Sequence, residues 1–112
     1  MENQMNILNN KIIKKVLGDE YSLEDSNGYR IAKNDIAIAK NGCFETINKF
    51  EFLDLCEKIM INDYNLIVST YNNKLNSYIC EISSFYGGET KIYEKNDKFE
   101  AIIEAFKNTI QL

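Results

Sequence analysis

Apolar residues recur at helical spacing in three stretches of the chain. The first stripe covers one face of residues 5–17 and is followed directly by Gly18, a common residue at helix C-caps. The second stripe predicts a helix over residues 49–61, because Asn48 and Glu51 form an N-x-x-E start, a variant of the capping box. Both stretches are therefore expected to form helices that bury one face.

A third helix is predicted after Asp97, which repeats this opening pattern together with Glu100. The apolar side of this helix consists of Phe99, Ile102, Ile103, Phe106 and Ile110. Their spacing is that of a single helix face, so we expect these side chains to belong to the core.

The segment between the first two helices carries two signals for β-hairpins. Asn27-Gly28 and Asn41-Gly42 are dipeptides typical of two-residue hairpin turns. Residues 29–32 can form a strand after the first turn, and residues 36–39 and 43–47 flank the second. The pattern therefore predicts one or two short hairpins in this segment.

Alternation of apolar and polar residues predicts three strands after the second helix. Residues 64–71 alternate, residues 72–74 form an Asn-rich turn, and residues 75–83 alternate again. Gly87-Gly88 marks the next turn. Residues 89–95 then form a largely polar third strand, which is typical of a sheet edge.

This alternation also assigns strand residues to the two faces of the sheet. The face that the second and third helices cover is expected to carry Leu66, Val68, Cys80 and Ile82. The opposite face, which the first helix covers in part, is expected to carry Tyr71, Glu81 and Tyr93. The order α-(ββ)-α-β-β-β-α predicts an α+β fold built on an antiparallel sheet. The length of 112 residues suits a single compact domain over residues 1–112.

The chain offers little catalytic or metal-binding chemistry. It contains no His, and its three Cys, at positions 43, 56 and 80, are isolated and lie in apolar patterns typical of core residues. We therefore expect no metal site, no cofactor and no catalytic residue. Asp54 and Glu57 share a helix face, so a hydrolase that uses carboxylates alone remains the enzymatic alternative.

The charge balance narrows the classes of partner. The formal net charge is −4 and the isoelectric point is about 4.8, which argues against direct nucleic-acid binding. No apolar run approaches the roughly 20 residues of a membrane span, and the first residues lack the pattern of a signal peptide. A cytoplasmic protein with reduced thiols and no membrane contact is expected.

The pattern of residues 5–110 resembles small phage proteins of the phage alpha-beta-alpha sandwich type. Residues 14–18 (KKVLG) are similar to the K-V-M-G run that ends the first helix in that family. Residues 55–59 (LCEKI) stand where the family has a V-V-E-K-like run, and residues 101–106 (AIIEAF) match its final A-I-x-x-A-A helix. Asp19 stands where the family usually has a Trp. The resemblance implies a phage or prophage accessory protein, by analogy an inhibitor of bacterial defence such as an anti-CRISPR protein.

These observations predict a non-enzymatic protein that occludes a host defence protein with a basic surface. The residues expected to bind this partner are Glu20, Glu24, Asp25, Tyr71, Glu81 and Tyr93. One alternative is a sponge for a small nucleotide immune signal, with a site made of Tyr86, Gly87, Gly88 and Lys91. An immunity protein that neutralises a toxin is another alternative, and pairing with a second copy of the chain is left open.

Overall fold

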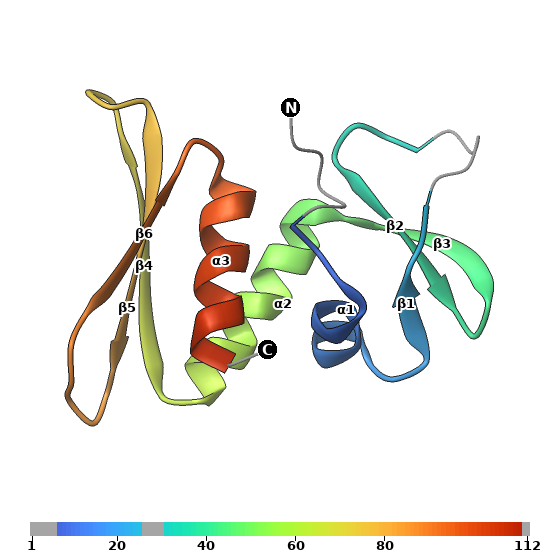
Figure 1. Ribbon diagram of the computed structural model, residues 1–112, viewed down its shortest axis with the longest axis horizontal. Helices are drawn as coiled ribbons and strands as arrows, with labels where there is room; N and C mark the ends of the chain where they lie inside the picture. Colours follow the sequence, from blue (N-terminus) through green and yellow to red (C-terminus); the bar gives the residue numbers. More distant parts are fainter. Residues whose placement is uncertain (1–6, 26–30, 111–112) are drawn as a thin grey trace. The chain divides into compact units, whose positions relative to one another are not determined.

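The computed structural model describes residues 7–25 and 31–110, and their contacts group into two units, residues 1–52 and 53–112. The described elements are three helices and two three-stranded antiparallel sheets (Figure 1). The α+β class is therefore confirmed. Three described strands stand between the first two helices, where a pair was predicted, and the strands form two sheets rather than one. The single domain over residues 1–112 stays a prediction, and each unit is described by itself below.

The first helix, α1 (Asn10–Leu17), begins later than the apolar pattern predicted. Asn9 has an extended backbone with φ −145°, and its side-chain Oδ1 accepts a hydrogen bond from the backbone N–H of Ile12 at 3.0 Å. A side chain that satisfies a free N–H in this way is typical of a helix N-cap, so the helix does not include residues 7–9 as predicted, and the predicted first residue, 5, lies outside the described residues. The predicted end is confirmed, because Gly18 follows with φ +124°.

The sheet of residues 1–52 has the strand order β1-β2-β3. Its strands are β1 (Tyr21–Leu23), β2 (Asp35–Lys40) and β3 (Cys43–Asn48). Asn41 and Gly42 both have positive φ, at 51° and 83°, as a hairpin turn between β2 and β3 requires. The second predicted hairpin is therefore confirmed.

The first predicted hairpin differs from the structure. Its turn, residues 27–28, lies outside the described residues, and Ile31 and Ala32 do not belong to a strand. Instead β1 pairs directly with β2, with Leu23 opposite Ile38. β2 is thus the central strand, and residues 36–39 are buried on both sides of it. Helix α1 lies against β1 and contributes the fully buried Ile12 and Ile13 (Figure 1).

Helix α2 (Lys49–Asn62) contains the point at which the two units divide. Its start is confirmed, because Asn48 Oδ1 accepts hydrogen bonds from the backbone N–H groups of Phe50 and Glu51. The second sheet has the order β4-β5-β6. Its strands are β4 (Asn65–Asn72), β5 (Ser77–Ser84) and β6 (Lys91–Lys95), and α3 (Lys98–Ile110) follows them.

Helix α3 packs on one side of this sheet, against β5 and β6 (Figure 1). Phe99, Ile102, Ile103 and Phe106 are almost fully buried, as the pattern predicted. Cys80 and Ile82 of β5 are buried as well, which confirms two of the four sheet residues expected in this core.

The other two expected core residues, Leu66 and Val68, lie on the wrong side for that prediction. The registers place Ser69, Cys80 and Tyr93 opposite one another, and Val68, Glu81 and Ile92 opposite one another. Residues opposite one another in an antiparallel ladder share a face. Leu66 and Val68 therefore lie on the face that carries Glu81, away from Cys80.

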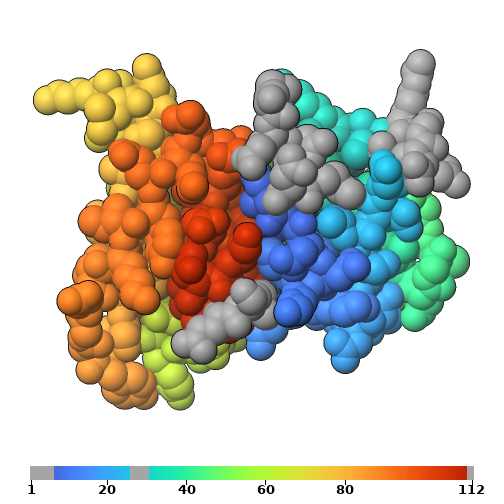
Figure 2. Space-filling view, viewed as in Figure 1, coloured from blue at the N-terminus to red at the C-terminus, as the bar shows by residue number. Residues whose placement is uncertain are grey.

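The length of the β4–β5 turn explains this difference. We predicted a three-residue turn at 72–74, but Asn72 pairs with Ser77, so four residues connect the strands. Asn72 Oδ1 accepts the N–H of Lys74, and Asn76 takes a positive φ of 49°. A shift of register by an odd number of residues moves every side chain of a strand to the other face. The turn, drawn in yellow, projects from the second unit in Figure 2.

Candidate functional site

The sheet face opposite α3 exposes four apolar side chains around one carboxylate. We call this surface the open face, and it consists of Leu66, Val68, Ile79, Ile92 and Glu81. The exposed fraction is 51% for the side chain of Leu66, 44% for Val68 and 62% for Ile92. Ile79 is half-buried between its strand neighbours. No helix in the described part of the second unit covers this side (Figure 1). Apolar side chains gathered on an exposed sheet face are typical of an interaction surface.

Glu81 lies in the middle of the open face. It stands on the central strand β5, with Val68 directly opposite on β4 and Ile92 directly opposite on β6. Glu94 lies on the same face and accepts a hydrogen bond from the buried Ser77 hydroxyl at 2.9 Å. A carboxylate bordered by apolar side chains favours a partner that brings a Lys or Arg within an apolar surface.

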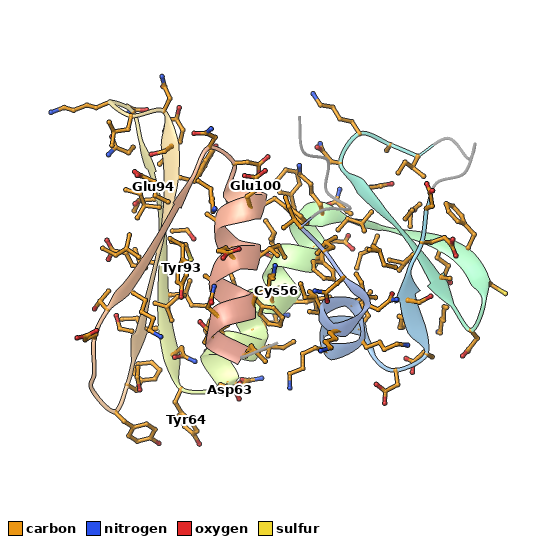
Figure 3. All side chains as sticks on the ribbon, viewed as in Figure 1. Cys56, Asp63, Tyr64, Tyr93, Glu94 and Glu100 are labelled. Carbon is orange, nitrogen blue, oxygen red and sulfur yellow. The ribbon has the colours of Figure 1, made fainter. Side chains whose placement is uncertain are left out.

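The predicted grouping of Tyr71, Glu81 and Tyr93 on one face was wrong. Tyr71 and Tyr93 share the face of Cys80, whereas Glu81 lies on the open face. Tyr93 points from β6 toward α3 (Figure 3), and burial, the carboxylate of Glu104 and the Cys80 thiol raise the pKa of its hydroxyl. Tyr71 is partly exposed, contacts the ring of Tyr78 and donates a hydrogen bond to Asn76 at 3.2 Å.

The predicted acidic part of the partner surface belongs to the other unit. Glu20 and Asp25 are exposed and Glu24 is half-exposed, next to the short strand β1. Because these residues and the tyrosines lie in different units, their combined surface stays a prediction.

The predicted nucleotide site does not form an enclosed cradle. The N–H of Gly87 already donates to the carbonyl of Ser84 at 3.2 Å, so it is committed to the turn. Added Cβ atoms at Gly87 and Gly88 would meet no neighbouring atom within 4 Å, so both glycines face open space. Lys91 is exposed on β6, opposite Ile82. Only Tyr86, which is 79% exposed, presents a ring on which a base could stack.

Three exposed aromatic residues follow the end of α2 and the end of β5, and we call them the aromatic end: Tyr64, Phe85 and Tyr86. The ring centroids of Tyr64 and Tyr86 are 5.3 Å apart, and the N–H of Phe85 donates to the carbonyl of Tyr64. All three side chains are exposed, and Tyr64 projects away from the sheet in Figure 3. Exposed Tyr and Phe rings are common anchors of protein interfaces.

Two thiols and one carboxylate of the second unit have raised pKa values. Burial raises the pKa of the Cys56 thiol to about 12 and, with smaller electrostatic contributions, raises that of Cys80, so both thiols are protonated near neutral pH. Burial raises the pKa of Glu57, the charge of Lys98 opposes this, and Asp54 adds to it. The part of α2 that belongs to the second unit lies on the same side of the sheet as α3 (Figure 1).

Cys43 differs from the other two cysteines and from the prediction that all three are core residues. It begins β3, is exposed, and stands opposite Lys40 across the turn. The apolar segment 43–47 suggested burial, but β3 is an edge strand of its sheet and exposes several of its side chains.

Sequence reasoning missed the open face because it placed Leu66 and Val68 in the core. The sequence of β4 leaves this choice open: Ser69 and Tyr71 can lie on a buried or on an exposed face, so the pattern of this strand alone does not show which of its two faces is buried. The aromatic end was recognised only through Tyr86. Tyr64 was expected to begin the strand, but its backbone is left-handed, with φ +63°. The alternation of apolar and polar residues gives no sign of this conformation.

Comparisons with known proteins add no relatives: no family model, curated protein or solved structure matches the chain. Among the described residues, no three His, Cys, Asp or Glu side chains gather as a metal site would need. None of the described helices has both the length and the apolar character needed to cross a membrane.

Proposed function

We propose that this chain is a non-enzymatic binding protein of a phage or mobile element that inhibits a bacterial defence system by occluding a protein partner. The binding part of the proposal is supported by one observation, the open face with Glu81 set between the exposed Val68 and Ile92. The anti-defence part is supported by the resemblance of residues 5–110 to small phage proteins.

The open face would bind by burying apolar area around one charged contact. Removing apolar surface from water contributes about 25 cal/mol per Å², and a few central side chains usually dominate the affinity. A Lys or Arg of the partner would pair with Glu81 away from water, where a charge-assisted hydrogen bond is strong. A basic groove that normally holds nucleic acid offers such side chains, and its occupation would block the defence nuclease.

A plaque assay tests this proposal. Cells that carry a CRISPR nuclease targeting a phage are transformed with the wild-type chain, with Glu81→Lys, or with Glu45→Lys. Glu45 is an exposed residue of β3, so the control makes the same charge change outside the open face. We expect plaque formation to be restored by the wild type and by Glu45→Lys, and lost with Glu81→Lys.

A panel of defence systems is needed, because each inhibitor acts on its own target. If the wild type restores plaques against no member of the panel, the anti-defence proposal is wrong. If Glu81→Lys protects the phage as well as Glu45→Lys does, the defence function stands but the open face is not its binding surface.

The sponge and the toxin antidote are separated by direct binding. In calorimetry with a cyclic dinucleotide, a sponge binds at micromolar concentration or tighter, and Lys91→Ala weakens that binding. The proposed occluding protein gives no heat with this ligand, and Glu81→Lys changes nothing in the titration. An antidote instead rescues cells from one co-expressed toxin in the absence of any phage.

A further inference from the structure

The edge strand β4 is open along its outer side. It occupies one edge of the order β4-β5-β6 and pairs only with β5. No backbone hydrogen bond between described residues reaches its outer side, and its residues 68–71 are exposed. An edge of this kind presents a row of N–H and C=O groups to which another strand can pair.

The register identifies the residues whose backbone groups point outward. The N–H of Phe85 donates to the carbonyl of Tyr64 at 2.9 Å, so Tyr64 directs its carbonyl toward β5. In an antiparallel ladder the backbone groups of successive residues point to alternate sides. Ile67, Ser69 and Tyr71, together with Asn65 at the strand start, therefore turn their N–H and C=O groups to the open edge.

This edge lacks the usual protection against pairing. Residues 64–73 contain no charged side chain and no proline. The other edge strand, β6, carries Lys91, Glu94 and Lys95 within five residues. Charged side chains on an edge disfavour pairing with other chains, so the two edges of one sheet differ in this respect.

We propose that β4 pairs antiparallel with β4 of a second copy of this chain, so that two three-stranded sheets form one continuous six-stranded sheet. A twofold axis normal to the sheet places one residue opposite itself. With Val68 at the axis, Ile67 pairs with Ser69 of the second copy and Asn65 pairs with Tyr71 of the second copy. This register uses all four outward-facing residues of each strand.

The charged residues at the two ends of the uncharged segment fit a second copy of the chain. Each chain has a net charge of −4, so two copies repel overall, and this repulsion is smallest where they approach through uncharged surface. Asp63 precedes the uncharged segment and Lys74 follows it. Antiparallel pairing brings Lys74 of each copy to the end of the strand where the other copy carries Asp63. The edge is thus complementary to itself in both charge and register.

Sedimentation equilibrium over a concentration series, from low micromolar to millimolar, tests the dimer. We expect the mass of the wild type to rise toward twice the 13.0 kDa of one chain. The matched variants are Val68→Glu and Ile92→Glu, which both place a new carboxylate directly across from Glu81 on the open face. Val68→Glu should remain a monomer, because its new carboxylate meets itself at the axis, and Ile92→Glu should dimerise like the wild type.

This pair separates edge pairing from other modes of association. Packing of two open faces against each other would be weakened by both variants, which would overturn the proposal. A wild type that stays monomeric, or a Val68→Glu variant that is folded and still dimerises, would overturn it as well. Because the readout is mass alone, the outcome does not depend on the proposed defence function.

Amide hydrogen exchange of the wild type tests the same proposal without any variant, and it decides the question if Val68→Glu does not fold. The outward-facing N–H groups of Ile67, Ser69 and Tyr71 should exchange at least tenfold more slowly at high than at low concentration. The outward-facing N–H groups of Ile92 and Glu94 on β6 are the control, and their exchange should not change. Equal protection at both edges, or at neither, would contradict pairing through β4.

Discussion

Replacing Phe106 by Ala tests the core that holds α3 against the second sheet. Phe106 has 0% of its surface exposed, and α3 lies against β5 and β6. Full burial of an aromatic side chain contributes about 1.5–3 kcal/mol by transfer from water, and the cavity left by truncation adds to the loss. The higher helix propensity of Ala offsets about 0.5 kcal/mol of this. We therefore expect the free energy of unfolding to fall by about 3–5 kcal/mol.

Urea unfolding followed by circular dichroism measures this loss, provided that the slope of the transition is the same in both proteins. Phe85→Ala is the matched control, since it makes the same truncation at an exposed ring of the same unit and should cost less than about 0.5 kcal/mol. A loss below about 1 kcal/mol for Phe106→Ala would show that this ring is not part of a packed core.

Three further predictions concern titration, thiol chemistry and capping. The raised pKa of Glu57 means that the folded state holds the proton of this carboxyl more tightly than the unfolded state does, so the stability of the wild type falls as the pH rises above 4.5 through the raised pKa. Glu57→Gln should remove that fall. In urea titrations the variant should therefore be stabilised more at neutral pH than at about pH 4. A maleimide should label the exposed Cys43 rapidly at neutral pH, and Cys56 and Cys80 only slowly until urea unfolds the chain, because burial protects both and raises their pKa values. Asn9→Ala should lower the free energy of unfolding by about 1 kcal/mol through loss of the helix cap, whereas Asn9→Ser should restore most of it.

The helices could be predicted from the sequence because their limits are local. Asn48 and Asp97 each accept backbone N–H groups of the turn that follows, so the side chain at a single position marks the start of α2 and α3. Gly18 ends α1 for an equally local reason, its positive φ. The start of α1 was missed although Asn9 is the same kind of signal, because the apolar stripe continues upstream of it.

The faces of the second sheet could not be predicted, because they depend on one residue of turn length. The four-residue turn before Ser77 is closed by Asn72 and Asn76, and a neighbouring Asn at position 73 offered an equally plausible three-residue turn. Once that choice is wrong, Leu66 and Val68 exchange sides with Ile67 and Ser69. The open face and the partner residues expected around Glu81 depend on the same choice, so the candidate site was less predictable than the fold.

The left-handed backbone of Tyr64 affects which residues are favoured at this position. A positive φ is readily adopted by Gly and tolerated by Asn, as at Asn41 and Asn76, but it is costly for a bulky aromatic residue. Replacement of Tyr64 by Gly or Asn would therefore relieve backbone strain while removing an exposed ring that contacts Tyr86. Laboratory selection for thermal stability alone should therefore favour Gly or Asn over tyrosine at this position.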